Sequence, residues 1–210
     1  MSTTTLPRRP SEAERRSALV QAAEEVFLRH GYAVANMDEV AQAVGMSKKT
    51  LYQLYPSKEA LFDAVVARFC APMQVGAEAA EPGDAEALIR VLDAVARHIL
   101  SPRHVALFRV IASEVHRAPE LAAAVQRSRN GGTGVIEAWL RAQAQNGWLD
   151  IEEAEAVAGM LVGMVIGEPH ILMLLGQREA PDAAEIHRRT RQAVAIFLGG
   201  TLREGASWPG

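Results

Sequence analysis

Two short helical segments and the start of a longer helix lie between residues 31 and 61, separated by a glycine and a proline, and constrain this chain most strongly. Asn36 and Ser47 each stand at a helix N-cap position, and apolar residues follow them at helical spacing. Gly45 provides a turn between the first two segments, and Pro56 ends the second. The pattern therefore predicts two short helices joined by a tight turn, followed at once by a longer helix capped by Ser57.

Two short helices joined in this way form a helix-turn-helix, which places the start of its second helix in the major groove of DNA. Lys48 and Lys49 open that recognition helix, predicted at about 47–54, where exposed N–H groups and the helix dipole also favour phosphate. Thr can touch a thymine methyl group, and Gln can bind adenine through two atoms. The candidate DNA-binding residues are Asn36, Ser47, Lys48, Lys49, Thr50, Tyr52, Gln53, Tyr55 and Lys58. A solvated face would also explain the lysines, but their place at a capped helix start favours DNA contact.

The charge distribution agrees with a localised basic surface. The whole chain has a net charge of −3, whereas residues 1–60 carry eight Lys or Arg and seven Asp or Glu. Cys70 is the only cysteine, which excludes a disulfide framework and a cysteine-based zinc site. The first residues are polar and lack the apolar segment of a signal peptide, so we expect a cytoplasmic protein associated with the nucleoid, without a cofactor or metal ion.

The rest of the chain shows apolar residues at helical spacing, so we predict an all-α fold of about nine helices. They are expected near 12–30, 37–44, 48–54, 58–80, 84–100, 102–117, 119–145, 151–175 and 182–203. Pro72 is expected to kink or split the fourth helix, and residues 131–134 to break the seventh. The predicted organisation is a flexible arm (1–10), a three-helix DNA-binding head (11–56), an effector-binding and dimerisation domain (57–204) and a frayed tail (205–210).

The helix predicted at 151–175 is apolar around most of its circumference and must therefore be covered on all sides. In a chain of 210 residues one side can meet the core, while the other needs a second copy of the chain. Three glycines four residues apart permit close helix approach. The candidate dimer-interface residues are Gly159, Gly163, Gly167, Ile186, Val194 and Phe197. Alternatively, these glycines lie in one buried helix and only weaken it. Glu168, Pro169 and His170 interrupt the apolar segment and make it a poor membrane span, so no membrane partner is expected.

The motif residues of the head resemble those of the TetR family of transcriptional regulators. They are Gly31-Tyr32, Val40-Ala41, Val44-Gly45-Met46-Ser47, Thr50-Leu51-Tyr52, Tyr55 and Ser57-Lys58-Glu59-Ala60-Leu61. The C-terminal part resembles the AefR-like subgroup more weakly, through Pro119-Glu120-Leu121, residues 140–143 and Gly147-Trp148-Leu149. The chain departs from the pattern at Ala35, where the family often has Thr, and at Leu54, where it often has His or Tyr.

The resemblance implies an all-α homodimer that binds a palindromic operator and usually represses, with Tyr52 and Lys58 on phosphates and Thr50 facing the DNA. It also implies a pocket between residues 84 and 175 for a small effector, largely apolar to judge from the side chains available. The candidate pocket residues are Phe69, Met73, His104, Phe108, Ile111, Trp139, Met160, Met164 and His170. Each of them could equally be ordinary core. The helix after Ser57 is expected to transmit effector binding to the head.

Two other classes of protein compete with this interpretation. An enzyme is disfavoured because no two of the six histidines are spaced three or four apart, and because no phosphate loop, nucleophile elbow or dinucleotide fingerprint occurs. A helical small-molecule sensor or interaction protein that has lost DNA binding, or binds DNA weakly, is the second alternative. This alternative is favoured only by Ala35 and Leu54, the two positions at which the chain departs from the family pattern.

Overall fold

The N-terminal helices begin and end at the residues that their sequence signals indicate. In the computed structural model, which describes residues 10–70, 85–132 and 134–201, α1 (Glu12–His30) opens with a capping box between Ser11 and Glu14. Its last residue is followed by Gly31 at φ +78°, a conformation that other residues rarely adopt. α2 (Met37–Ala43) and α3 (Lys48–Leu54) are capped by the side chains of Asn36 and Ser47.

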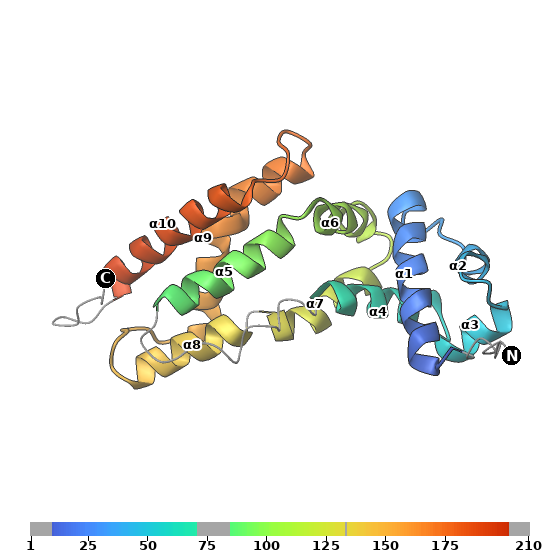
Figure 1. Ribbon diagram of the computed structural model, residues 1–210, viewed down its shortest axis with the longest axis horizontal. Helices are drawn as coiled ribbons and strands as arrows, with labels where there is room; N and C mark the ends of the chain where they lie inside the picture. The colour runs from blue at the N-terminus through green and yellow to red at the C-terminus, as the bar shows by residue number, and fades with distance from the viewer. Residues whose placement is uncertain (1–9, 71–84, 133, 202–210) are drawn as a thin grey trace, which may run out of the picture.

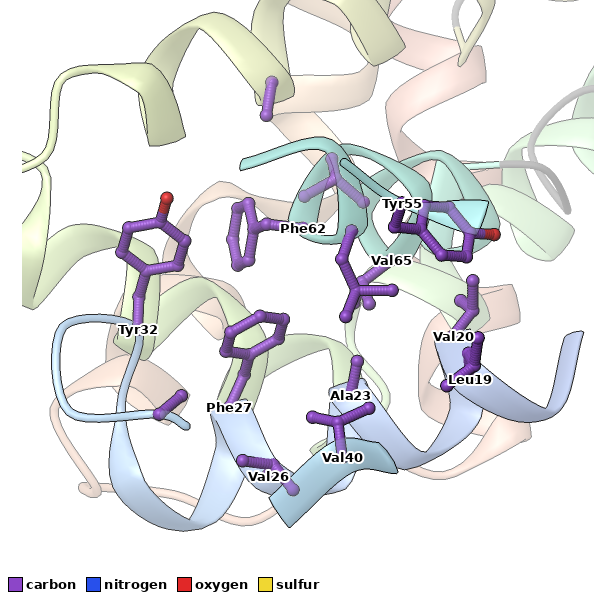
Figure 2. Close-up of a cluster of buried hydrophobic side chains, with 14 of the residues drawn as sticks. Leu19, Val20, Ala23, Val26, Phe27, Tyr32, Val40, Tyr55, Phe62 and Val65 are labelled. Atoms are coloured by element: carbon purple, nitrogen blue, oxygen red, sulfur yellow. The ribbon is translucent and has the colours of Figure 1, made fainter. Parts of the chain in front are cut away.

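The core of the head is built around three aromatic rings. Phe27, Tyr32 and Phe62 lie with centroids 5.0–5.7 Å apart, and Phe62 meets each of the other two edge to face. Figure 2 shows these rings among aliphatic side chains of α1, α2 and α4 (Lys58–Cys70). Apolar residues at helical spacing in α1 and α4 are buried in this cluster: Leu19, Ala22, Ala23, Val26 and Phe27 in α1, and Leu61, Phe62, Val65, Val66 and Phe69 in α4. The cluster also includes residues of α6 (Pro102–Glu114) and α7 (Glu120–Gly132), so the head shares one core with them.

A second hydrophobic cluster fills the opposite half of the molecule. It is formed by α5 (Ala85–Ile99), α8 (Gly134–Gln145), α9 (Ala154–Leu174) and α10 (Ala183–Thr201). In Figure 1 the head stands at one end, α8, α9 and α10 stand towards the other, and α4 and α6 connect the two halves. α6 packs against both α1 and α9, so it contacts both the head and the distal half.

α9 is the most apolar helix of the described residues. By length and composition it could cross a membrane, since its most apolar window has a mean hydropathy of 1.7, and a third of that window is buried. Core helices of soluble proteins have the same properties. Pro169 lies inside α9 and is buried, and the helix continues past it to Leu174.

The architecture confirms the predicted all-α fold. The described residues form ten helices rather than about nine, because the segment predicted at 119–145 is divided into α7 and α8 at the glycine-rich break. α4 is described as far as Cys70, so the expected kink at Pro72 lies outside the described residues. The expected arm lies outside them as far as residue 9, and the expected tail lies outside them entirely.

Candidate nucleic-acid interface and effector site

The turn of the helix-turn-helix is fixed by short-range hydrogen bonds. The Asn36 side chain accepts a bond of 2.9 Å from the N–H of Asp38, and Gly45 adopts φ +67° between α2 and α3. The Ser47 hydroxyl accepts a bond of 3.1 Å from the N–H of Thr50 and lies 2.9 Å from the Thr50 hydroxyl. Because Leu51 is fully buried, the opposite side of α3 is held towards solvent.

The solvent-facing side of α3 carries most of the candidate DNA-binding residues. Lys48, Lys49, Tyr52 and Gln53 are exposed, whereas Thr50 is half-buried. Lys48 pairs with Asp38 of α2, with Nζ 3.0 Å from Oδ2, and this carboxylate raises the pKa of the ammonium group. Both side chains of the pair are exposed, so the pair contributes little to stability and Lys48 can exchange its partner for a phosphate.

Lys58 stands in a different environment from the other candidate lysines. Its Nζ donates hydrogen bonds to the backbone carbonyls of Tyr32, Ala33 and Ala35, at 2.8, 2.9 and 3.3 Å. It also lies 4.8 Å from the centroid of the Tyr32 ring. The ammonium group therefore holds the loop between α1 and α2, and a phosphate would have to replace or share these partners.

Tyr55 is the most buried of the candidate DNA-binding residues. Only 9% of its surface is exposed, and its ring lies in the head core with the Arg16 guanidinium 5.3 Å from the centroid. Arg16 also donates to the backbone carbonyl of Leu54 at 2.8 Å, which ties the end of α3 to α1. Tyr55 thus fixes the orientation of the recognition helix, and little of its side chain can reach DNA.

α6 is linked to the head by three polar contacts and to α9 by two. At one end the Arg103 side chain forms an ion pair with Glu24 of α1, whose side chain is buried. At the other end Glu114 accepts hydrogen bonds from the backbone N–H groups of Tyr32 and Ala33. Between them Arg109 donates to the carbonyls of Met173 and Leu174, at the end of α9. No local signal in the sequence indicates these contacts, because their partners lie 64 to 82 residues apart.

Several candidate pocket residues meet where α4, α5, α6 and α9 approach one another. The His104 ring lies edge to face with Phe69, at a centroid distance of 5.9 Å, and with His98, at 5.1 Å. Phe108 packs edge to face against His170 of α9 at 5.1 Å. His104 Nδ1 and His170 Nε2 are buried without a hydrogen-bond partner.

Burial is the main cause of the electrostatic behaviour of these histidines. Burial, together with the charges of His98 and His170, lowers the pKa of His104 to about 4. Burial also lowers the pKa of His170. Both rings are therefore neutral at pH 7 and keep an unsatisfied nitrogen within this part of the molecule.

The remaining candidate pocket residues are dispersed. Ile111 is buried in the cluster of the head, and Trp139 is buried in the distal cluster. Met160 and Met164 are 69% and 41% exposed on the outer side of α9, away from the other candidates. Met73 lies outside the described residues.

The outer side of α9 carries an apolar face that none of the described residues covers. We call this the α9 face, and it consists of Gly159, Met160, Gly163, Met164, Gly167, Ile171 and Leu175. A methyl group added at Gly159, Gly163 or Gly167 would meet no atom within 4 Å. Ile196 of α10 is also exposed, whereas the predicted interface residues Ile186 and Val194 are buried in the distal cluster and Phe197 is half-buried. The spacing of 160, 164, 171 and 175 places these exposed apolar residues on one side of the helix.

Comparisons with known proteins agree with this arrangement. A family model described as bacterial regulatory proteins, tetR family, matches residues 19–65, and one described as the C-terminal domain of AefR-like transcriptional repressors matches residues 86–200. Both matches confirm the resemblance inferred from the motif residues. The family consists of transcriptional regulators, which are not enzymes.

Individual relatives match over different lengths. The transcriptional regulator UidR of Escherichia coli K12 is 26% identical over 201 residues, which is 89% of this chain and 92% of UidR. The transcriptional activator FasR of Mycolicibacterium smegmatis is 51% identical over 55 residues, only 26% of this chain and 25% of FasR. YhgD of Bacillus subtilis is 34% identical over 70 residues, 33% of this chain and 37% of YhgD.

Solved structures share the fold over nearly the whole chain. A TetR-family regulator from Mesorhizobium loti superposes with a TM-score of 0.77 at 21% identity, covering 93% of this chain and all of that one. The flavonoid-responsive regulator FrrA gives a TM-score of 0.76 at 26% identity, covering 92% of this chain and all of that one.

Proposed function

Since the chain belongs to the TetR family of bacterial transcriptional regulators, we propose that it acts as a homodimer on a two-fold symmetric operator and is released by a small, largely apolar ligand. TetR-family regulators are soluble cytoplasmic proteins, and we place this one on the nucleoid. The observation that carries the proposal is the side of α3 held towards solvent, with Lys48, Lys49, Tyr52 and Gln53 exposed above a fully buried Leu51.

The exposed side of α3 has the chemistry that DNA recognition requires. Two ammonium groups at the start of the helix attract phosphates, while Gln53 can bind a base edge in the major groove. The half-buried Thr50 presents a methyl group that suits a thymine. The side chains of Asn36 and Ser47 already accept hydrogen bonds as helix caps. We therefore propose that they hold the two helix starts in place and that neighbouring backbone N–H groups contact the phosphates.

The α9 face supports the homodimer. It is a largely apolar surface with close-approach glycines, interrupted by the exposed carboxylate of Glu168, and solvent exposure of such a surface is unfavourable for a protomer on its own. A second copy related by a two-fold axis would cover it with the same residues, as isologous interfaces do. The two heads would then meet two half-sites related by the same symmetry.

The ligand response is supported by unsatisfied polar groups within mostly apolar surroundings in the C-terminal part. His104 and His170 each keep a buried nitrogen without a partner beside Phe69 and Phe108. FrrA, which has the same fold at 26% identity, is described as flavonoid-responsive, and this favours a small organic effector here too. FasR is described as an activator, so both signs of regulation occur among the relatives of this chain.

Selection of binding sites from random duplex DNA tests the DNA-binding part. We expect enrichment of a two-fold symmetric site and an affinity that falls as salt rises. The Lys48→Ala/Lys49→Ala protein should bind more weakly, with a log–log salt slope shallower by about 2 per head, given ~0.9 per phosphate contact. Arg97→Ala/Arg141→Ala is the matched control, since it removes two exposed cations from α5 and α8, far from α3 (Figure 1).

The outcome separates this proposal from its alternative, a helical sensor or interaction protein with lost or weak DNA binding. Failure to enrich any site, with the purified dimer and with cell extract added, would favour the sensor. An equal loss of affinity in the lysine variant and in the control would show only a general effect of net charge, and would contradict a DNA contact by α3.

A further inference from the structure

Trp139 and Gln143 stand one turn apart on the inner side of α8. Trp139 is 6% exposed and Gln143 is 1% exposed, and both side chains point away from solvent together with Ile136 and Leu140. α8 packs there against α5 and α9, whose contributions to this cluster are aliphatic. The two polar side chains therefore lie side by side in an otherwise apolar interior.

All the polar atoms of these two side chains lack a partner. The indole Nε1 of Trp139 and both the Nε2 and the Oε1 of Gln143 are buried without a hydrogen bond. Folded proteins satisfy the large majority of buried polar atoms, so three unsatisfied atoms from adjacent positions of one helix require an explanation. The indole N–H of Trp139 and the amide N–H groups of Gln143 can donate hydrogen bonds, and the amide oxygen of Gln143 can accept one. These atoms therefore match a small group that carries an acceptor beside a donor.

We propose that Trp139 and Gln143 form a polar anchor for the effector within the distal cluster, a place apart from the His104 and His170 nitrogens, and bind a neutral group with an acceptor beside a donor, such as a primary carboxamide, carried on an apolar body. The apolar body suits the aliphatic side chains of α5 and α9. Among the residues that the structure describes, the buried polar or charged side chains are Glu24, Asp93, Gln143 and Thr190, none of them a cation. A carboxylate would find no buried positive charge here, and this favours the neutral group.

The anchor rests on the proposed ligand response, and it has a consequence for the stability of the ligand-free protein. Buried polar atoms without a hydrogen bond lower the stability of the ligand-free protein, so replacing them by apolar atoms should stabilise it. Gln143→Met keeps the length of the side chain and removes the amide, and we expect its melting temperature to rise by roughly 2–4 °C. Gln145→Met, at the exposed end of the same helix, is the control and should leave the melting temperature unchanged.

The binding test uses benzamide, with benzoate as its anionic analogue and toluene as the apolar body alone. We expect benzamide to bind the wild type, and to bind Gln143→Met and Trp139→Phe roughly three- to ten-fold more weakly by calorimetry. Benzoate should bind more weakly than benzamide, and toluene should bind all three proteins alike.

Three results would overturn the proposal. A lower melting temperature for Gln143→Met, with the control unchanged, would show that the amide is already satisfied within the folded protein. Failure of benzamide to bind, or equal binding to the wild type and to both variants, would remove these side chains as the anchor. Benzoate binding as tightly as benzamide would contradict the neutral ligand. None of these measurements uses DNA. The anchor proposal can therefore fail while operator binding holds, and operator binding can fail while the anchor proposal holds.

Discussion

The carboxylate of Glu114 accepts a hydrogen bond of 2.9 Å from the backbone N–H of Tyr32, so the last residue of α6 is fixed to the loop that follows α1. A second bond, of 2.5 Å, comes from the N–H of Ala33. Lys58 holds the carbonyl groups of the same loop from the other side. Because this loop leads directly into α2, the helix-turn-helix is positioned jointly by α4 and by α6.

Glu114→Gln should weaken this connection measurably. The variant replaces a charged acceptor of two hydrogen bonds by an amide with one acceptor oxygen, and we expect a loss of about 1–2 kcal/mol of unfolding free energy. Urea denaturation at pH 7 measures it. Glu153→Gln is the control, because Glu153 is exposed and makes no side-chain capping bond at the start of α9. Equal effects of the two substitutions would mean that Glu114 contributes no more than a surface charge.

Gly31→Ala should damage the same connection more severely. A β-carbon at this position would collide with the Glu114 carboxylate, and the residue has φ +78°. Both effects are unfavourable, and strained backbone alone costs about 1–3 kcal/mol. We expect a marked fall in melting temperature, while Gly163→Ala, at an open helical position, provides the comparison. A combined Gly31→Ala/Glu114→Ala protein should recover part of the loss, and no recovery would contradict the collision.

Lys58 and Lys49 should affect stability and DNA binding differently. Lys58 holds three carbonyl groups and is half-buried, so Lys58→Met should lower the unfolding free energy by about 1–2 kcal/mol. Lys49 is exposed, so Lys49→Ala should leave stability unchanged and reduce the salt slope of operator binding by ~0.9 per head. If Lys58→Met changes the salt slope by the same amount at unchanged stability, then Lys58 acts as a phosphate contact rather than as a loop clamp.

Gly163 tests the proposed homodimer with a substitution that is harmless to the protomer. Its added methyl group meets no atom within 4 Å, and Ala is favoured over Gly in a helix by about 0.5–1 kcal/mol. We therefore expect Gly163→Ala to preserve or raise protomer stability while weakening a dimer that relies on close approach of the α9 faces. Light scattering over a range of concentrations measures the dimer, and Ile171→Glu should dissociate it completely because a charge would be buried. A dimer unaffected by both changes would have to use another surface.

Local signals in the sequence were sufficient to predict the helices of the head. Capping by Asn36 and Ser47 depends on residues at most three positions away, and both predicted caps are present. The stripes of α1 and α4 follow from helical periodicity and are buried as expected. Periodicity also identified α9 as apolar all round, a property that depends on its own residues alone.

Contacts between distant segments could not be predicted in this way. The side of α10 that faces the core depends on how α5 packs, and for this reason Ile186 and Val194 lie inside whereas Ile196 is exposed. The burial of Tyr55 depends on α1, and the role of Lys58 depends on the carbonyls of a loop more than twenty residues away. Two predicted pocket residues, Met160 and Met164, lie on the outer side of α9. Apolar residues surround this helix, so the sequence does not indicate which of its sides faces the core.

The stability of the protein should fall in mild acid because of His104. Burial holds its folded-state pKa at about 4, below the value of 6.5 expected for an unfolded chain. The unfolded chain therefore takes up a proton first as the pH drops below 6.5, and the folded state loses stability until about pH 4. Between pH 7 and pH 5 this loss is about 2 kcal/mol for His104 alone, and His170 adds to it in the same direction.

Urea denaturation of the wild type and of His104→Phe at pH 7 and pH 5 measures this contribution. Phe keeps a ring that can pack against Phe69 and His98, so the variant should fold, and it also removes an unsatisfied nitrogen. We expect the wild type to lose about 2 kcal/mol more than the variant over this interval, in which most carboxylates remain ionised. His116→Phe, at an exposed position, should follow the wild type. If His104→Phe loses as much stability as the wild type, the acid sensitivity belongs to another group, and His104 is protonated as readily in the folded protein as in the unfolded chain.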